Sequence, residues 1–251
     1  MSITKTMSEH KFTNNPRSIK RLMAERKKIF DEREDLAKEG LYFQSSEEKI
    51  DTYYQFMIIG PPDSCYTGGF YFFDCQYPDS YPFEPMKIKS CTQGGGIRKH
   101  PNLYTCGKCC FSFLGTWSGP SWSSLQTSVS VAFSMRSVLT DNPLQNEPSY
   151  GNGKLTDQKH LEYSRLVTYF NIRYATIEML TKPPEKFKGF LPYMETYFVE
   201  HYKQYVKQLD SLKGLNSFNS SYNGVPVPFN YDAVKKQLEE LYNVIKNRQE
   251  V

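Results

Sequence analysis

Cysteine is scarce in this chain, and so are the features that would place it outside the cell or in a membrane. Its 251 residues include six cysteines, too few for a disulfide scaffold at this length. The first residues contain no apolar core like that of a secretory signal, and no apolar run approaches the roughly 20 residues that cross a bilayer. We therefore expect free thiols, no membrane partner, and an intracellular protein of the cytoplasm, the nucleus or both.

A marked excess of one charge is lacking as well. Lys and Arg number 31 against 27 Asp and Glu, which gives a net charge of +4. Binding to nucleic acid favours a strongly basic face with a recognisable motif, so this balance predicts no nucleic-acid partner. The length is enough for one large domain, or for a domain of about 150 residues with an appendage, and it can bury a sizeable core without cross-links.

Hydrophobic spacing predicts an N-terminal helix followed by a small sheet. After a polar segment at 1–14, which we expect to be flexible, Asn15 and Pro16 have the pattern of an N-cap and a first helical residue. Apolar residues then recur at helical spacing. Between residues 52 and 90, three short runs rich in aromatic and branched residues predict an antiparallel meander, and a fourth, looser strand is expected near Ile97.

Helices are predicted again in the second half. Ser123 with Gln126 has the pattern of a capping box, so we expect a helix to begin there, and another helix fits residues 157–180. Two consecutive prolines at 183–184 end that helix and, by this interpretation, the core domain. The predicted division is a flexible N-terminus at 1–14, a core domain at 15–182 and a helical extension at 183–251.

Within the extension, composition and periodicity alternate. An aromatic-rich helix is expected over about 192–212, and the Ser- and Asn-rich stretch at 214–224 has the composition of a flexible linker. The last helix carries apolar residues at alternating spacings of three and four from Tyr231 to Ile245. Such a pattern is typical either of a coiled coil or of a helix that packs against the body of the same protein. Because so few heptads are too short for a stable coiled coil, docking is favoured.

A cluster of cysteines follows the predicted sheet. Cys106, Cys109 and Cys110 lie within five positions, just after a His-Pro-Asn turn at 100–102. Cys106 and Cys109 have the C-x2-C spacing of half a zinc site, but the chain offers no second half. A thioredoxin-like couple would lie where a strand leads into a helix, whereas here the flanks are a turn and a Phe-rich extended run. A metal site and a redox couple are both disfavoured, and no metal is expected.

The third interpretation makes one thiol a nucleophile. Cysteine attacks readily and leaves readily, so a thioester can be formed, held and passed to an amine. The reaction then needs a donor for the oxyanion, and a side-chain amide such as that of Asn102 is typically worth roughly 3 to 4 kcal/mol of barrier. The alternative for Asn102 is a turn residue that hydrogen-bonds its own backbone, and the residues alone favour that alternative.

A family resemblance bears on this choice. The basic amphipathic first helix, the meander, the Tyr-Pro-Phe-x-Pro segment at 81–85, and a cysteine eight residues after Asn102 together resemble the ubiquitin-conjugating enzymes over roughly residues 15–180. Two further motifs, Leu-Gly-Thr-Trp at 114–117 and Asn-Glu-Pro at 146–148, are similar to those of the type Z group of that family. That group also has a helical C-terminal extension.

The resemblance implies a fold and an activity. The fold would be the α+β UBC fold, with an N-terminal helix, a four-stranded antiparallel sheet and C-terminal helices. Cys110 would receive ubiquitin or a ubiquitin-like modifier from an activating enzyme as a thioester and transfer it to a lysine amine, directly or with a ligase, without a cofactor. Asn102 would stabilise the oxyanion, and His100 and Pro101 would build the turn that aims it.

The chain also departs from the family's pattern. Many relatives carry an Asp two residues after the cysteine, where this chain has Ser112, as the type Z group does. Asp141 or Glu147 would then receive the substrate lysine, and no spacing selects between them. Cys109 is interpreted as a small buried residue and Cys106 as an incidental neighbour, the alternative for Cys106 being an inhibitory disulfide under oxidation.

The resemblance also implies partner surfaces. Basic residues of the first helix would face an acidic surface of the activating enzyme, although a solvated charged face is the general alternative. Two aromatic residues would contact ligases, the alternatives being a half-buried loop residue and a lid on the core. The five candidate partner-binding residues are Arg17, Lys20, Arg21, Phe83 and Trp122.

Two rival functions are kept beside this prediction. One is a non-catalytic binding module on the same fold, which would be expected to lack Cys110 or Asn102, and both residues are present. The other is a zinc or redox protein that uses Cys106 and Cys109. The favoured prediction is a ubiquitin-conjugating enzyme that acts on protein substrates.

Overall fold

The first helix begins where the sequence predicts. In a computed structural model of the chain, the structure describes residues 15–45, 53–220 and 222–249, so the expectation for 1–14 lies outside these ranges. Helix α1 (Pro16–Asp31) follows Asn15, whose side chain accepts the Arg17 N–H at 3.0 Å and so satisfies a donor that the helix leaves free. A short helix α2 (Arg33–Lys38) follows at once.

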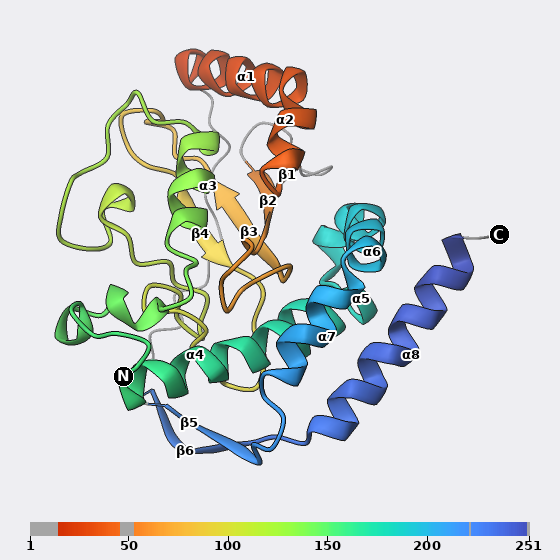
Figure 1. The fold of residues 1–251 in the computed structure, drawn as a ribbon. Coiled ribbons are helices and arrows are strands. Elements are labelled where there is room, and N and C mark those ends of the chain that lie inside the picture. Colours follow the sequence, from red (N-terminus) through yellow and green to blue (C-terminus); the bar gives the residue numbers. More distant parts are fainter. Residues whose placement is uncertain (1–14, 46–52, 221, 250–251) are drawn as a thin grey trace.

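Four antiparallel strands form the central sheet (Figure 1). They are β1 (Leu41–Ser45), β2 (Tyr53–Ile59), β3 (Phe70–Gln76) and β4 (Lys87–Ser90), paired in chain order. The three strands predicted from hydrophobic runs are confirmed. The strand expected near Ile97 is wrong, because that residue lies in a turn where its N–H donates to the Gly94 carbonyl. The fourth strand is instead β1, a short edge strand with half-buried residues and no strong pattern.

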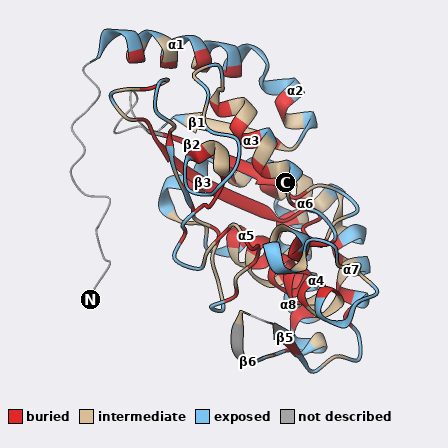
Figure 2. Ribbon diagram, turned by 90° about the vertical axis from the view of Figure 1, so that its left-hand side faces the viewer, coloured by how far each residue is buried: buried red, intermediate tan, exposed pale blue. Residues whose placement is uncertain are grey.

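The sheet is covered on both faces, and every residue of β3 is buried (Figure 2). Alternate residues of a strand point to opposite faces. On one face, Phe72 stacks on Phe187 of the C-terminal extension with ring centroids 4.6 Å apart, and Lys186 forms an ion pair with Asp74. On the other face, Tyr71 donates its hydroxyl to the Asn171 side chain at 2.7 Å. The extension therefore completes the core.

Helix α3 (Ser128–Ser137) begins later than predicted. Its capping box is formed by Thr127 and Ser130, each of whose hydroxyls accepts the other's N–H, at 3.2 Å and 2.8 Å. The predicted start at Ser123 is therefore wrong. Ser123 and Gln126 do interact, but they close a turn ahead of the helix, in which the Gln126 N–H donates to the Ser123 carbonyl.

The long helix predicted at 157–180 is confirmed, with one irregularity. Helix α4 (Gln158–Phe170) continues into a π-helical segment η4 (Asn171–Glu178) and then α5 (Met179–Thr181). Asn171, at the change of pitch, is fully buried, and its amide donates to the Thr67 carbonyl at 2.9 Å. The remaining short helices are η1 (Ser112–Leu114), η2 (Pro143–Asn146), η3 (Pro148–Tyr150) and η5 (Glu185–Phe190).

The extension wraps around the core (Figure 1). It contains α6 (Leu191–Glu200), α7 (Tyr202–Asp210), β5 (Ser217–Ser220), β6 (Asn223–Pro228) and α8 (Tyr231–Gln249). Strands β5 and β6 form a hairpin where composition predicts a linker, because Phe218 is buried and stacks on Tyr169 at 5.2 Å. Helix α8 docks on the body as expected, with Tyr242 stacked on Tyr202 at 3.9 Å. None of the helices in the described ranges is long and apolar enough to cross a membrane.

Candidate active site

The His-Pro-Asn turn is held by a fully buried imidazole. His100 Nδ1 accepts the Asn102 N–H at 3.0 Å, and Nε2 lies 3.1 Å from the Val138 carbonyl, to which it donates. One ring nitrogen accepts and the other donates, so the ring is neutral. Burial lowers the pKa of His100 to about 3, which keeps it neutral across the physiological range. His100 therefore shapes the turn and is no proton carrier.

Asn102 and Cys110 face each other across a short antiparallel pairing. The Cys110 N–H donates to the Asn102 carbonyl at 2.9 Å, and the Asn102 side-chain amide donates to the Cys110 carbonyl at 2.6 Å. Leu103 pairs with Cys109 one step further along. The spacing of eight residues thus reflects a hairpin that returns the cysteine to the asparagine. Asn102 does not bond its own backbone as in the alternative interpretation.

The thiol of Cys110 is covered by the loop that follows it. Cys110 is 3% exposed, and its thiol donates to the Thr116 carbonyl at 2.9 Å. The Thr116 hydroxyl in turn accepts the Phe111 N–H at 2.9 Å, and Gly115 turns the chain back with φ of 67°. The Leu-Gly-Thr-Trp motif therefore builds a tight turn over the thiol.

The other two cysteines of the cluster lie apart from this pairing. Cys109 is buried, as its interpretation as a small core residue requires, and burial raises the pKa of its thiol to about 12. Cys106 is exposed in the turn that joins Tyr104 to Lys108, whose backbones are hydrogen-bonded at 3.0 Å. Among residues 15–45, 53–220 and 222–249, His, Cys, Asp and Glu nowhere gather in a group of three that would hold a metal ion.

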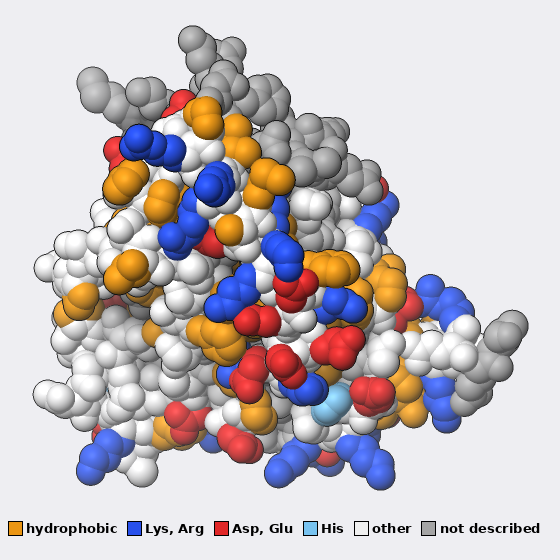
Figure 3. Space-filling view, turned by 90° about the horizontal axis from the view of Figure 1, so that it is seen from above, with side chains coloured by type: hydrophobic (Ala, Val, Ile, Leu, Met, Phe, Trp, Pro, Cys, Tyr) orange, Lys and Arg blue, Asp and Glu red, His pale blue; other side chains and the backbone are white. Residues whose placement is uncertain are grey.

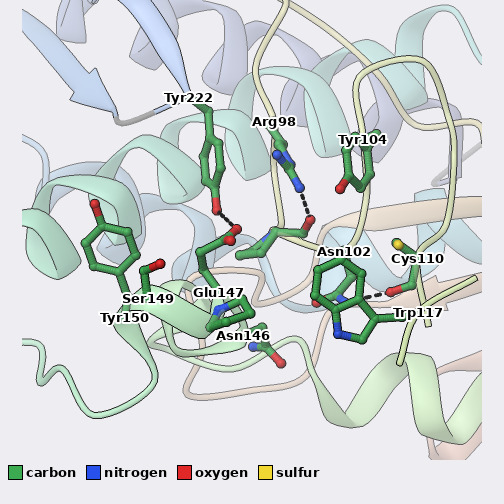
Figure 4. A pocket seen from close by; sticks show the side chains of 12 residues that line it. Arg98, Asn102, Tyr104, Cys110, Trp117, Asn146, Glu147, Ser149, Tyr150 and Tyr222 are labelled. Atoms are coloured by element: carbon green, nitrogen blue, oxygen red, sulfur yellow. Dashed lines mark hydrogen bonds between the residues drawn. The ribbon is translucent and has the colours of Figure 1, made fainter. Parts of the chain in front are cut away.

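A cavity of about 350 Å³ opens beside the thiol (Figure 4). Both Cys110 and Asn102 line it, and so does Glu147, whose carboxylate accepts the Tyr222 hydroxyl at 2.6 Å. Asp141 does not line this cavity; it is exposed. Of the two carboxylates that the sequence left open, only Glu147 lines the cavity that Cys110 and Asn102 also line. The full lining is Arg98, Pro101, Asn102, Tyr104, Cys110, Trp117, Asn146, Glu147, Pro148, Ser149, Tyr150 and Tyr222.

Sequence reasoning missed most of the aromatic and basic lining. The Arg98 guanidinium lies between two rings, 3.8 Å from the centroid of Tyr104 and 4.4 Å from that of Tyr222, and it donates to the Pro101 carbonyl. Tyr104 lies two residues beyond Asn102, and Trp117 belongs to the Leu-Gly-Thr-Trp motif. Their closeness in sequence to the candidate site residues could have indicated that both line the cavity. Tyr222 lies in the segment predicted as a linker, so its composition concealed it.

The basic residues of α1 separate into two kinds. Arg17 and Lys20 are exposed. Seen from above in Figure 3, the molecule shows basic side chains in one part of its surface and acidic ones in a neighbouring part. Arg21 is different, because it forms an ion pair with the buried Glu25 at 2.6 Å and donates to the Gln126 carbonyl at 2.9 Å. Arg21 thus holds α1 against the turn that precedes α3.

The two aromatic candidates for ligase contacts also differ. The Phe83 side chain is 75% exposed. Trp122 is half-buried, with its indole N–H donating to the Pro82 carbonyl at 2.7 Å and its ring 6.0 Å from that of Tyr81. Phe83 is therefore free to contact another protein, whereas Trp122 also braces the loop that carries Phe83.

Comparison with known proteins agrees with this geometry. The family model described as ubiquitin-conjugating enzyme matches residues 21–170, more than half of the chain. The chain belongs to the ubiquitin-conjugating enzyme family. The α+β UBC fold expected from the sequence is confirmed by this match together with the four-stranded antiparallel sheet.

Several ubiquitin-conjugating enzymes are similar over longer stretches. The chain is 33% identical to ubiquitin-conjugating enzyme E2 Z of Xenopus tropicalis over 197 residues, covering 76% of this chain and 62% of that protein. It is 38% identical to E2 Z of Homo sapiens over 154 residues, which cover 59% and 42%. A putative ubiquitin-conjugating enzyme E2 38 of Arabidopsis thaliana is 35% identical over 190 residues, which cover 72% and 54%. The resemblance to the type Z group is confirmed.

The chain spans about half of the length of the relatives it matches, from 42% to 62% for the three just described. Among solved structures, human ubiquitin-conjugating enzyme E2 G1 is 27% identical, with a TM-score of 0.42, and the match covers 49% of this chain and 95% of that one.

Proposed function

We propose that this ubiquitin-conjugating enzyme carries ubiquitin or a ubiquitin-like modifier as a thioester on Cys110 and transfers it to a lysine amine. The observation that carries the proposal is the shared cavity, which Cys110, Asn102 and Glu147 all line. In the first step the Cys110 sulfur attacks the carbonyl carbon of the thioester that the modifier forms with the activating enzyme. The thiol of the activating enzyme is the leaving group. Sulfur suits both roles, since it attacks and leaves readily.

Asn102 serves the second step as an oxyanion donor. When an amine attacks the thioester carbonyl, negative charge develops on its oxygen, and a positioned N–H donor lowers the barrier. A side-chain amide has two N–H donors. One holds the Cys110 carbonyl at 2.6 Å, which leaves the other for the oxyanion and keeps the amide beside the nucleophile.

Glu147 receives the incoming lysine. A lysine ammonium with a pKa near 10.4 must lose a proton before its nitrogen can attack, and a carboxylate beside the thioester favours that loss. Glu147 lines the cavity, and Ser112, at the position where many relatives carry Asp, does not. Glu147 is proposed for this role rather than Asp141, because Asp141 does not line the cavity.

Charging requires the cover over the thiol to open. The Cys110 thiol donates its hydrogen bond to the Thr116 carbonyl, and Cys110 is only 3% exposed. The loop at 112–119 carries positive φ values at Gly115 and Gly119, which lets it turn sharply without strain. In this proposal the loop moves away from the sulfur when the modifier's C-terminal tail arrives.

The proposed partners follow from the exposed residues. Arg17 and Lys20 would contact an acidic face of the activating enzyme, and Phe83 would contact ligases. Arg21 has a smaller part in this scheme, because Glu25 already binds it. Attraction between opposite charges speeds encounter and weakens with salt, so charging through α1 should slow as ionic strength rises.

The test is incubation with an activating enzyme, ATP and ubiquitin, followed by electrophoresis with and without reductant. The proposal predicts a reductant-sensitive adduct that Cys110→Ala abolishes and that Cys106→Ala and Cys109→Ala retain. Other modifiers, each with its own activating enzyme, are run in parallel. A wild-type protein that forms no adduct with any of them would favour a non-catalytic binding module.

A further inference from the structure

A residue of the C-terminal extension reaches into the cavity beside the thiol. Tyr222 lies between strands β5 and β6, and its hydroxyl donates to Glu147 Oε2 at 2.6 Å (Figure 4). These two residues are 75 positions apart in the chain. The hairpin thus supplies the hydrogen-bond donor for the carboxylate that the proposed reaction uses.

Ring contacts fix where the Tyr222 hydroxyl points. Its ring meets that of Tyr163 edge to face with centroids 5.4 Å apart, and the Arg98 guanidinium lies 4.4 Å from its centre. Arg98 is itself tied to the His-Pro-Asn turn, since it donates to the Pro101 carbonyl and lies over Tyr104. A continuous set of contacts therefore connects the hairpin to the turn that carries Asn102.

The hydroxyl of Tyr222 stays a donor at neutral pH. Burial and the neighbouring Glu147 carboxylate both raise the pKa of Tyr222 above its ordinary value, so the phenol keeps its proton. The bond to Oε2 fixes the orientation of the Glu147 carboxylate and leaves its second oxygen, Oε1, as a further acceptor. In this pair Glu147 is the acceptor group, and Tyr222 is the residue that orients it.

We propose that Tyr222 is a positioning residue for lysine transfer, holding Glu147 in the orientation that accepts a proton from the incoming amine. The inference rests on the proposed function of the cavity. In the step concerned, the lysine nitrogen forms a bond to the thioester carbonyl carbon and the bond from that carbon to the Cys110 sulfur breaks. The ammonium first gives one proton to Glu147 Oε1, which passes it to solvent, and the neutral amine then attacks. As the amide forms, its nitrogen loses a second proton to solvent, and the sulfur leaves as a thiolate that takes up a proton from water.

Two nucleophiles separate positioning from simple support of the fold. Free lysine is protonated at neutral pH and must lose a proton before it can attack, whereas hydroxylamine is largely neutral and attacks without that step. The charged enzyme is prepared, the activating enzyme is stopped, and loss of the thioester is followed with each nucleophile. The ratio of the lysine rate to the hydroxylamine rate then reports on proton removal and cancels differences in charging or in general access to the thioester.

The variant is Tyr222→Phe, which keeps the ring contacts with Arg98 and Tyr163 and removes the hydroxyl. The matched control is Tyr231→Phe, at the start of α8 in the same extension, whose hydroxyl donates to Asp210. We expect the ratio to fall about tenfold in Tyr222→Phe, less than the roughly hundredfold or greater loss typical when a proton acceptor itself is removed. Tyr231→Phe should keep the wild-type ratio.

A double-mutant cycle with Glu147→Gln completes the test, because residues that act together show non-additive effects. If Tyr222 acts through Glu147, adding Tyr222→Phe to Glu147→Gln lowers the ratio no further. An unchanged ratio in Tyr222→Phe, or an equal fall in both backgrounds, would overturn the inference. A wild-type protein that never forms the thioester would instead contradict the proposed function, so the two failures are distinguishable.

Discussion

The side-chain amide of Asn102 donates a hydrogen bond of 2.6 Å to the main-chain carbonyl of Cys110. The Cys110 N–H returns a bond of 2.9 Å to the Asn102 carbonyl. The proposed oxyanion donor and the proposed nucleophile are therefore joined through main-chain atoms on both sides. The loop that covers the thiol takes part in neither of these two bonds.

Replacing Asn102 by Ala should slow transfer far more than it destabilises the fold. Loss of one oxyanion donor typically costs about 100-fold or more in rate, whereas loss of one internal hydrogen bond costs about 1 kcal/mol of stability. The measurements are single-turnover discharge to free lysine and the free energy of unfolding in urea, with the exposed Asn152→Ala as control. Wild-type discharge by Asn102→Ala would rule out the oxyanion role.

A buried carboxylate ties α1 to α3. Glu25 accepts hydrogen bonds from Arg21 at 2.6 Å, from the Tyr81 hydroxyl at 2.6 Å, and from the N–H and hydroxyl of Ser128 at 3.0 Å and 2.9 Å. Glu25→Gln removes the charge that Arg21 requires and replaces an acceptor oxygen with a donor. We expect a loss of about 2 kcal/mol in the free energy of unfolding.

The control for that measurement is Glu34→Gln, because the Glu34 side chain is 84% exposed and its contact with Arg33 is 3.7 Å long. Exposed pairs of this kind contribute little to stability. The control should leave the urea midpoint close to that of the wild type. Equal midpoints for Glu25→Gln and Glu34→Gln would show that the buried cluster does not hold the two helices together.

Lys99 lowers the stability of the fold at neutral pH. The residue is fully buried, its Nζ finds no hydrogen-bond partner within the described part of the chain, and it lies 5.7 Å from the centre of the Phe170 ring. Burial lowers its pKa from 10.5 to about 8, which corresponds to roughly 3 kcal/mol. Lys99→Met should therefore raise the free energy of unfolding at pH 7 by up to about that amount, unlike Lys236→Met at an exposed site.

The sign of the pH dependence follows from the same shift. Between pH 8 and about 10.4 the unfolded chain keeps the Lys99 proton and the folded chain has lost it, so wild-type stability rises with pH in that window. The advantage of Lys99→Met should be largest below pH 8 and should shrink as pH rises to about 10.4. Urea denaturation at pH 7, 9 and 10.5 checks this, and a constant advantage would contradict it.

Local signals were sufficient where a single short pattern decides the structure. Asn15 and Pro16 predicted the start of α1, and the spacing of the His-Pro-Asn turn from Cys110 contributed only to the family resemblance, not to a prediction that the two residues pair. Strand β1 was missed because its residues are half-buried and carry no strict alternation. Its place is decided by pairing with β2 along the whole strand.

The rest of the site depends on contacts between distant residues. Nothing in the sequence separates Glu147 from Asp141, because the difference arises from how η2 and η3 fold back toward the thiol. The stretch at 214–224, which includes the first strand of the hairpin, was predicted as a linker because Ser and Asn dominate it, while one buried aromatic residue, Phe218, docks the hairpin on α4. Tyr222 reaches the cavity only as a result of that docking.

The most direct test of the central claim identifies the atom that bears the modifier. Serine in place of a thioester-forming cysteine holds the modifier as an ester, which resists reductant but is cleaved by alkali. Incubation with the activating enzyme, ATP and the modifier should therefore give a reductant-resistant, alkali-labile adduct with Cys110→Ser. Cys109→Ser and Cys106→Ser should still give an adduct that reductant removes. A reductant-resistant adduct on Cys109→Ser, or a reductant-sensitive one on Cys110→Ser, would contradict the assignment of Cys110.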